Sequence, residues 1–228
     1  YMSVLVRFLL PEKESEKSRV EYLDENLLNT PELAFNQVQN EFRYMLSTAV
    51  KNLFRAYSDF SGKDSGKTDK IKRKEEIIDN LQDDLTQYLV RLSGKELSYD
   101  LSERIPAFVH CINDAERIGD LAEKIERISE VRKSEKLEFS EEAVNAFEKM
   151  KKTLEKSFIF LNELLDGRNN AFQDLLKNEE KINNMTSVMV EENISRTRNR
   201  ECNDRSSVMF VEILSVFERV GDHLVNVG

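Results

Sequence analysis

The feature of this sequence that most restricts its fold is an internal repeat. The pentapeptide ERIGD occupies Glu116–Asp120, and the nearly identical ERVGD occupies Glu218–Asp222. When the sequence is shifted by 102 residues, the apolar positions around the two pentapeptides also coincide, so that Phe108, for example, falls on Phe210. A repeat of this length predicts one supersecondary unit that is built twice, each copy with its own buried face.

The unit itself is predicted to be helical. Apolar residues recur at spacings of three and four along most of the chain, which is typical of amphipathic helices, and no segment shows the alternation of a strand. Seven Gly and three Pro in 228 residues leave room for long helices. Good helix starts occur at Thr30-Pro31-Glu32 and at Ser140-Glu141-Glu142. The expected helices span about 30–60, 70–93 and 99–131, then 140–165, 171–196 and 204–228.

The sequence therefore predicts an all-α fold of two tandem three-helix bundle repeats with spectrin-repeat-like packing. The first repeat is placed at residues 30–133 and the second at residues 134–228, after a linker at residues 1–29. The linker begins with YMSVLVRFLLP, which is apolar except for Arg7. Eleven residues are too few to span a bilayer. The segment is therefore either a buried terminus or the remainder of a membrane helix.

The pentapeptide combines two locally unfavourable choices in both copies. Glu116 and Asp120 lie one turn apart on the same helix face, as do Glu218 and Asp222, and carboxylates at this spacing repel one another by a few tenths of a kcal/mol. A glycine inside a helix costs about 1 kcal/mol relative to alanine. Local rules that are broken twice at matched positions indicate a functional site.

The glycines lie in the apolar stripe of their helices, where a missing side chain lets a neighbouring helix approach. Gly119 and Gly221 are therefore predicted to mark close helix packing, with the second helix of the same repeat as the neighbour. That helix carries a matching pair in each repeat, Glu75 with Asp79 and Glu179 with Asn183. Facing pairs of carboxylates suit hard cations. The predicted metal ligands are Glu75, Asp79, Glu116, Asp120, Glu179, Asn183, Glu218 and Asp222, and the metal is Mg, Mn, Fe or Zn.

The composition of the chain limits which partners and functions it can have. A formal charge of -9 disfavours nucleic acid as a partner. Cys111 and Cys202 lack metal-box spacing and fit a reducing compartment. A metal-dependent enzyme would need a base beside the ligands, and none is evident, so no enzymatic activity and no organic cofactor are expected. A plain helical scaffold, in which the acidic residues are only solvated, remains the simplest alternative.

Two segments resemble the signature of the PhoU family. These are INDAERIGDLAEKI at Ile112–Ile125 and FERVGDHLVNVG at Phe217–Gly228. The resemblance implies two three-helix repeats with paired acidic motifs that bind metal clusters in several members. At position 183 this chain has an amide where the family pattern has an acid, which puts metal occupancy of the second site in question.

A further stretch, LDENLLNTPELAFNQVQNE at Leu23–Glu41, resembles the segment that joins the membrane part of bacterial Na⁺/phosphate cotransporter family proteins to their cytoplasmic PhoU-like domain. This resemblance implies a regulatory domain at the cytoplasmic face of the bacterial membrane, with its own transmembrane transporter domain as partner. It also favours reading the apolar start as the exit of a membrane helix. The alternative is a stand-alone PhoU-type regulator that binds a transporter ATPase or a sensor kinase. Homodimerisation is left open.

Overall fold

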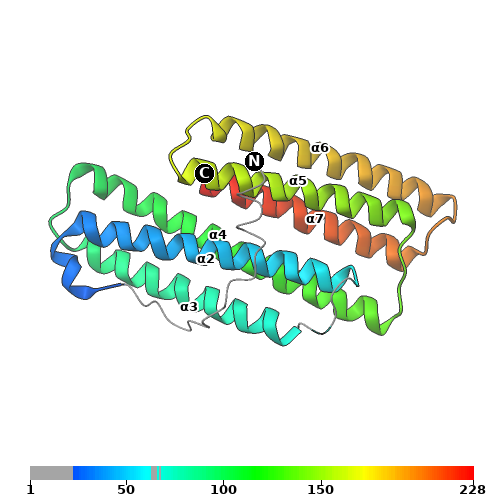
Figure 1. Ribbon diagram of the computed structural model, residues 1–228. Coiled ribbons are helices and arrows are strands. Elements are labelled where there is room, and N and C mark those ends of the chain that lie inside the picture. Colours follow the sequence, from blue (N-terminus) through cyan, green and yellow to red (C-terminus); the bar gives the residue numbers. More distant parts are fainter. Residues whose placement is uncertain (1–22, 63–65, 67) are drawn as a thin grey trace.

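The computed structural model describes residues 23–62, 66 and 68–228, and this part of the chain consists of helices joined by short loops (Figure 1). A 3₁₀ helix, η1, is followed by six α-helices. Their bounds are η1 Glu25–Asn29, α2 Pro31–Phe60, α3 Thr68–Ser93, α4 Tyr99–Ser134, α5 Glu141–Leu165, α6 Ala171–Arg198 and α7 Asp204–Val227. Helices α2 to α4 form one bundle and α5 to α7 form a second, which confirms the predicted all-α architecture. The apolar segment at residues 1–11 lies outside the described residues.

Side-chain caps explain several helix starts. The hydroxyl of Ser98 accepts a hydrogen bond from the amide of Leu101, and the hydroxyl of Ser140 accepts one from the amide of Ala143. Thr30, which the sequence also favours as a cap, makes no such side-chain bond before α2. There, Pro31 in the first helical position favours the start because its fixed φ suits a helix.

Aromatic side chains join the two bundles. The buried ring of Tyr57 on α2 lies 5.4 Å from the ring of Phe217 on α7, and its hydroxyl donates a 2.9 Å hydrogen bond to Glu148 on α5. One turn further along α2, the ring of Phe60 lies 5.6 Å from that of Phe147 on α5. Helices α4 and α7 also pack against each other. The bundles therefore lie side by side, with α3 and α6 on the outer sides (Figure 1).

A buried polar contact lies within the α4–α7 interface. The ring nitrogen Nδ1 of His223 is 2.7 Å from a carboxylate oxygen of Asp114, and the amide of Asn226 donates to the same oxygen at 3.3 Å. His223 and Asp114 are 8% and 7% exposed. His223 is therefore a packing residue with a specific partner across the interface.

We expect the Asp114–His223 contact to stabilise the bundle interface. Removing Asp114 leaves His223 buried without its partner, and removing His223 leaves Asp114 with only its longer contacts to Asn226 and Arg117. Asp114→Ala and His223→Ala should therefore each lower the free energy of unfolding by about 1–3 kcal/mol. The double variant should cost less than the sum of the two. Urea unfolding of the four proteins measures this coupling. The exposed His110 on α4 provides the control, and additive losses would contradict the prediction.

Candidate functional site

Each pentapeptide glycine lies against an isoleucine of the preceding helix. A Cβ atom at Gly119 on α4 would lie 3.2 Å from the side chain of Ile78 on α3. In the second bundle, a Cβ atom at Gly221 on α7 would lie 3.3 Å from the side chain of Ile182 on α6. These distances are tighter than ordinary contacts between side-chain carbons, so the glycines set how closely the helices approach.

The register around this contact is the same on both helices of a pair. Glu75 and Asp79 lie three residues before and one residue after Ile78, and Glu116 and Asp120 lie at the same offsets from Gly119. Because α3 and α4 follow one another through a short turn, they run in opposite directions. The glutamate of one helix is therefore brought toward the aspartate of the other.

The electrostatics of the first repeat agree with this register. Burial raises the pKa of Glu75 to about 7, and the carboxylates of Asp79, Glu123 and Asp120 add to the rise. Burial also raises the pKa of Glu116, with further contributions from Asp120 on its own helix and Asp79 on α3. The pKa of Asp120 is raised by burial and by Asp79 and Glu123, although Arg127 and Arg219 oppose the shift. The four predicted acids thus share one electrostatic environment.

One further acid of α4 belongs to this region and was not selected from the sequence. Glu123 follows Asp120 by three residues, so it lies on the same face, and its spacing from Glu116 could have revealed it. Glu126, further along α4, is fully buried, and the groups that act on its carboxylate are Thr68, Lys72 and Glu130 rather than the four predicted acids. Burial raises the pKa of Glu126, and Glu130 contributes. No sequence pattern distinguishes this buried glutamate from a solvated one.

The second repeat carries a weaker version of the cluster. Burial raises the pKa of Glu218 on α7, and Asp222 and Glu179 add to the rise, so the α6 acid does reach its α7 counterparts. Asn183 donates a hydrogen bond from its amide nitrogen to the carboxylate of Glu179. The amide oxygen of Asn183 and the hydroxyl of Thr186 are shielded from solvent and lack partners among the described residues.

Carboxylate oxygens are the donor type that hard cations prefer, and no basic group contributes to the pKa shift at Glu75. Within the described ranges, however, no three His, Cys, Asp or Glu side chains converge in an arrangement that could hold a metal ion. The two helix pairs therefore bring the predicted ligands into one region without forming a closed coordination shell. Metal binding remains a prediction.

Comparison with known families supplies the decisive observation. Residues 42–128 and 147–228 match the model of the PhoU domain. This chain belongs to the PhoU domain family. The two matched regions fall within the two helical bundles, so each bundle corresponds to one PhoU unit. Among curated proteins and among solved structures, no match to this chain was found.

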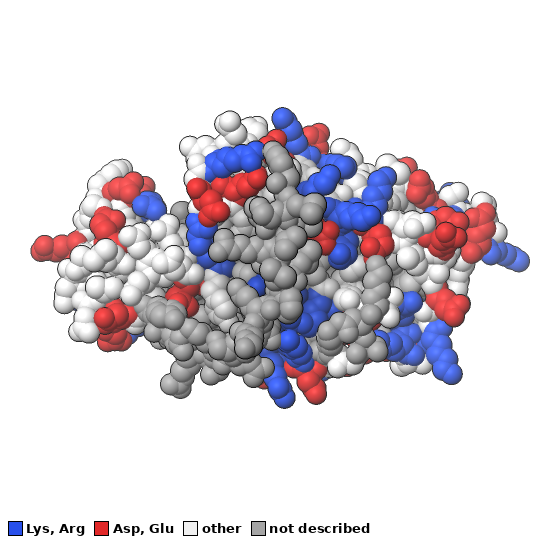
Figure 2. Space-filling model, in the orientation of Figure 1, with Lys and Arg blue, Asp and Glu red and all other residues white. Residues whose placement is uncertain are grey.

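Membership of the PhoU family defines a class of function. PhoU domains are regulatory rather than catalytic, interact with partners, and suggest a role in phosphate homeostasis. Within residues 23–62 and 68–228, no helix combines the length and the apolar character that a membrane crossing requires. On the face in Figure 2, Lys and Arg side chains lie among Asp and Glu side chains over the described surface.

The glycine contacts of these PhoU units predict that the free energy of unfolding depends steeply on the size of the side chain at these positions. Gly119→Leu should lower the free energy of unfolding by about 1–3 kcal/mol, because the larger side chain overpacks the contact with Ile78. Gly119→Ala should be nearly neutral, since the gain in helix propensity of about 1 kcal/mol offsets a small shift of Ile78. Thermal unfolding measures both. Ala107→Leu at an exposed position of α4 is the control, and equal effects at both positions would contradict the prediction.

The raised pKa of Glu75 predicts a pH effect on stability. The native state binds more protons than the unfolded chain between about pH 4.5 and 7, so stability should fall as the pH rises through this window. Glu75→Gln removes the cost of ionisation. At about pH 8 and without metal, this variant should be more stable than the wild type by about 0.5–1 kcal/mol after allowance for solvent screening.

Urea unfolding in chelator-treated buffers across this pH range tests the effect of Glu75. Glu76→Gln, at the adjacent exposed position of α3, changes the charge equally and should leave the pH dependence as in the wild type. Identical pH profiles for the two variants would show that Glu75 does not carry the effect.

Proposed function

We propose that this PhoU chain is the cytoplasmic regulatory domain of a sodium-dependent phosphate cotransporter. The family match supports a regulatory role, and the resemblance of Leu23–Glu41 to the joining segment of such transporters supports this particular setting. The domain itself would not transport. It would sense a signal and bias the attached transporter through the chain that enters the first bundle.

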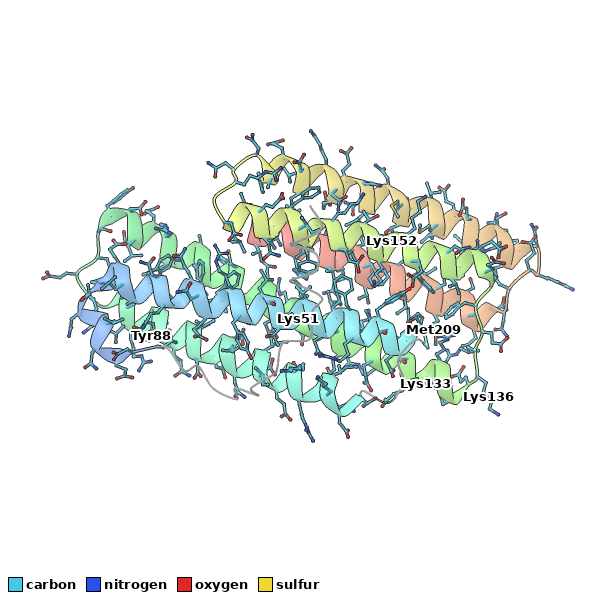
Figure 3. All side chains as sticks on the ribbon, in the orientation of Figure 1. Lys51, Tyr88, Lys133, Lys136, Lys152 and Met209 are labelled. Atoms are coloured by element: carbon cyan, nitrogen blue, oxygen red, sulfur yellow. The ribbon has the colours of Figure 1, made fainter. Side chains whose placement is uncertain are left out.

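The contacts of the joining segment carry the proposal, because they couple that segment to the first bundle. Tyr88 lies on α3 (Figure 3), and its hydroxyl donates a 2.8 Å hydrogen bond to the backbone carbonyl of Asp24. Arg91, one turn along α3, forms an ion pair with Glu25, and Leu28 of η1 is buried. A displacement of α3 would therefore move the backbone at residues 24–28, from which any preceding segment extends.

Cation binding between the helices would supply the signal. The residues suited to hold a Mg, Mn, Fe or Zn ion are Glu75, Asp79, Glu116 and Asp120 in the first repeat, and Glu179, Asn183, Glu218 and Asp222 in the second. The positive charge of the ion would offset the repulsion between the facing carboxylates. Those carboxylates would then hold α3 against α4 in a defined arrangement, and α3 in turn holds the joining segment through Tyr88 and Arg91.

The transporter setting is tested on the complete gene. The proposal predicts several apolar spans of about 20 residues in the same reading frame upstream of Tyr1. A start codon close upstream, with no such span, would instead favour a stand-alone PhoU regulator that binds a transporter ATPase or a sensor kinase. Sequencing the gene and its flanking region distinguishes the two.

The regulatory role is tested by transport. In proteoliposomes with the complete protein, Glu116→Ala/Asp120→Ala should change sodium-dependent uptake of radiolabelled phosphate several-fold while the protein remains folded. The variant should also lose the metal that mass spectrometry detects in protein purified without chelator. Asp100→Ala/Glu103→Ala removes two exposed acids of the same helix and serves as the control. Unchanged uptake in the first variant would refute the proposed regulation.

A further inference from the structure

An open groove lies between α5 and α6 on the second bundle. Its volume is about 560 Å³, and Lys149 of α5 and Lys181 of α6 are among the residues that line it. Its apolar lining comes from α6, where Met185 and Met189 are buried and Val188 is 54% exposed. Methionine side chains adapt their shape to a contacting surface, which makes them common where proteins bind one another. The groove therefore has an apolar strip on which a second protein surface can pack.

The matching side of the first repeat is covered by the chain itself. At the shift of 104 residues that aligns the two inner helices, Glu192 matches Tyr88 and Val188 matches Asp84. Tyr88 is fully buried and bonds to the backbone of Asp24 in the joining segment. Glu192 is exposed, and the described helices that pack against α6 are α5 and α7. No described segment of the chain therefore covers the groove of the second repeat.

The ends of α5 and α6 pair in an antiparallel sense, which fixes the two ends of the groove. Near the start of α6, the amide of Asn178 donates a 2.7 Å hydrogen bond to the hydroxyl of Ser157, in the C-terminal half of α5. At the other end, Arg196 in the last turn of α6 is close enough to Glu142 in the first turn of α5 to lower its pKa, after the larger effects of local hydrogen bonds.

The charge of the groove changes sign from one of these ends to the other. Positions three and seven residues after Lys149 lie on its face of α5, as does the position seven residues before it. The half toward the start of α6 carries the exposed lysines Lys149, Lys152, Lys156, Lys177 and Lys181, with Glu180 among them. The half toward the end of α6 carries the exposed glutamates Glu142, Glu191 and Glu192.

A surface with this gradient is complementary to itself. Lys177 lies seven residues before Asn184, and Glu192 lies eight residues after it. If a two-fold axis passes close to Asn184, two α6 helices run antiparallel, and Lys177 of each copy faces Glu192 of the other. Val188 of both copies then lies near the axis. Self-complementarity of this kind is what an interface with two-fold symmetry requires. A different protein would need the reverse gradient, which the groove already supplies for a second copy.

We propose that two copies of this chain associate as a two-fold symmetric dimer through the α5–α6 groove. The apolar strip at Val188 supplies the centre of the interface, and the charged halves on either side set its register and orientation. The interface involves the second bundle, so the joining segment keeps its contacts with α3 in the first. This inference does not depend on metal binding or on the transporter setting.

The experiment reverses the charge of one half of the groove at a time. Sedimentation equilibrium in chelator-treated, low-salt buffer measures dimerisation over a concentration series from micromolar to submillimolar. The wild type should dimerise, and high salt should weaken the dimer because it screens the exposed charges. Lys177→Glu/Lys181→Glu and Glu191→Lys/Glu192→Lys should each raise the dimer dissociation constant at least about tenfold, because like charges then face each other twice per dimer.

An equimolar mixture of the two charge-reversed variants is the decisive sample. In the mixed dimer, both contacts join opposite charges again, so the mixture should form heterodimers with an affinity close to that of the wild type. Circular dichroism checks that each variant is folded. Arg73→Glu, at the position of α3 that matches Lys177, and Glu76→Lys alter exposed charges of the first repeat and should leave the dimer unchanged.

Three results would overturn the inference. The first is a wild type that stays monomeric at submillimolar concentration. The second is a dimer that folded charge-reversed variants form as tightly as the wild type, since the interface would then lie elsewhere. The third is a mixture of folded variants that does not associate more tightly than either variant alone, since the two halves of the groove would then not face each other.

Discussion

The close approach of two helices at a glycine is the constraint on which the rest of the structure depends. Each glycine costs about 1 kcal/mol of helix stability relative to alanine. The space that its missing side chain leaves is occupied by an isoleucine of the neighbouring helix. This contact fixes the register of the helix pair. Since the acids lie at equal offsets from Ile78 and Gly119, the same contact that packs the core also sets carboxylates of α3 against carboxylates of α4. The glycine contact therefore determines both the packing of the helix pair and the positions of the acids.

The helical architecture could be predicted because its causes are local. Spacings of three and four, scarce breakers and two serine caps are visible in single segments, and the observed α4, Tyr99–Ser134, exceeds the expected range by only three residues. The glycine contacts could be predicted from the sequence for a different reason. A glycine inside a helix is unfavourable, so its occurrence at matched positions in two repeats, each time beside the same Glu and Asp, indicates a function that a single copy would not reveal.

What the sequence did not reveal depends on contacts between distant segments. The Asp114–His223 pair joins residues 109 positions apart across the two bundles, and neither residue stands out from the many polar residues of amphipathic helices. Glu126 illustrates the same limit. Among 43 acidic residues, burial alone distinguishes the few whose ionisation is costly, and burial is decided by which helices pack together.

A comparison with Asp59 supports the view that the acids of the first repeat are more than a product of packing. Burial alone would raise the pKa of Asp59, but hydrogen bonds from Lys133 and Ser129 outweigh it and lower the pKa. Here the fold supplies a cation and a hydroxyl to a buried carboxylate. Beside Glu75 the neighbouring charges that shift its pKa are all negative. The fold thus provides a compensating cation for Asp59 but none for Glu75. Glu75 and its acidic neighbours are therefore the place where a cation from solution would relieve the most repulsion.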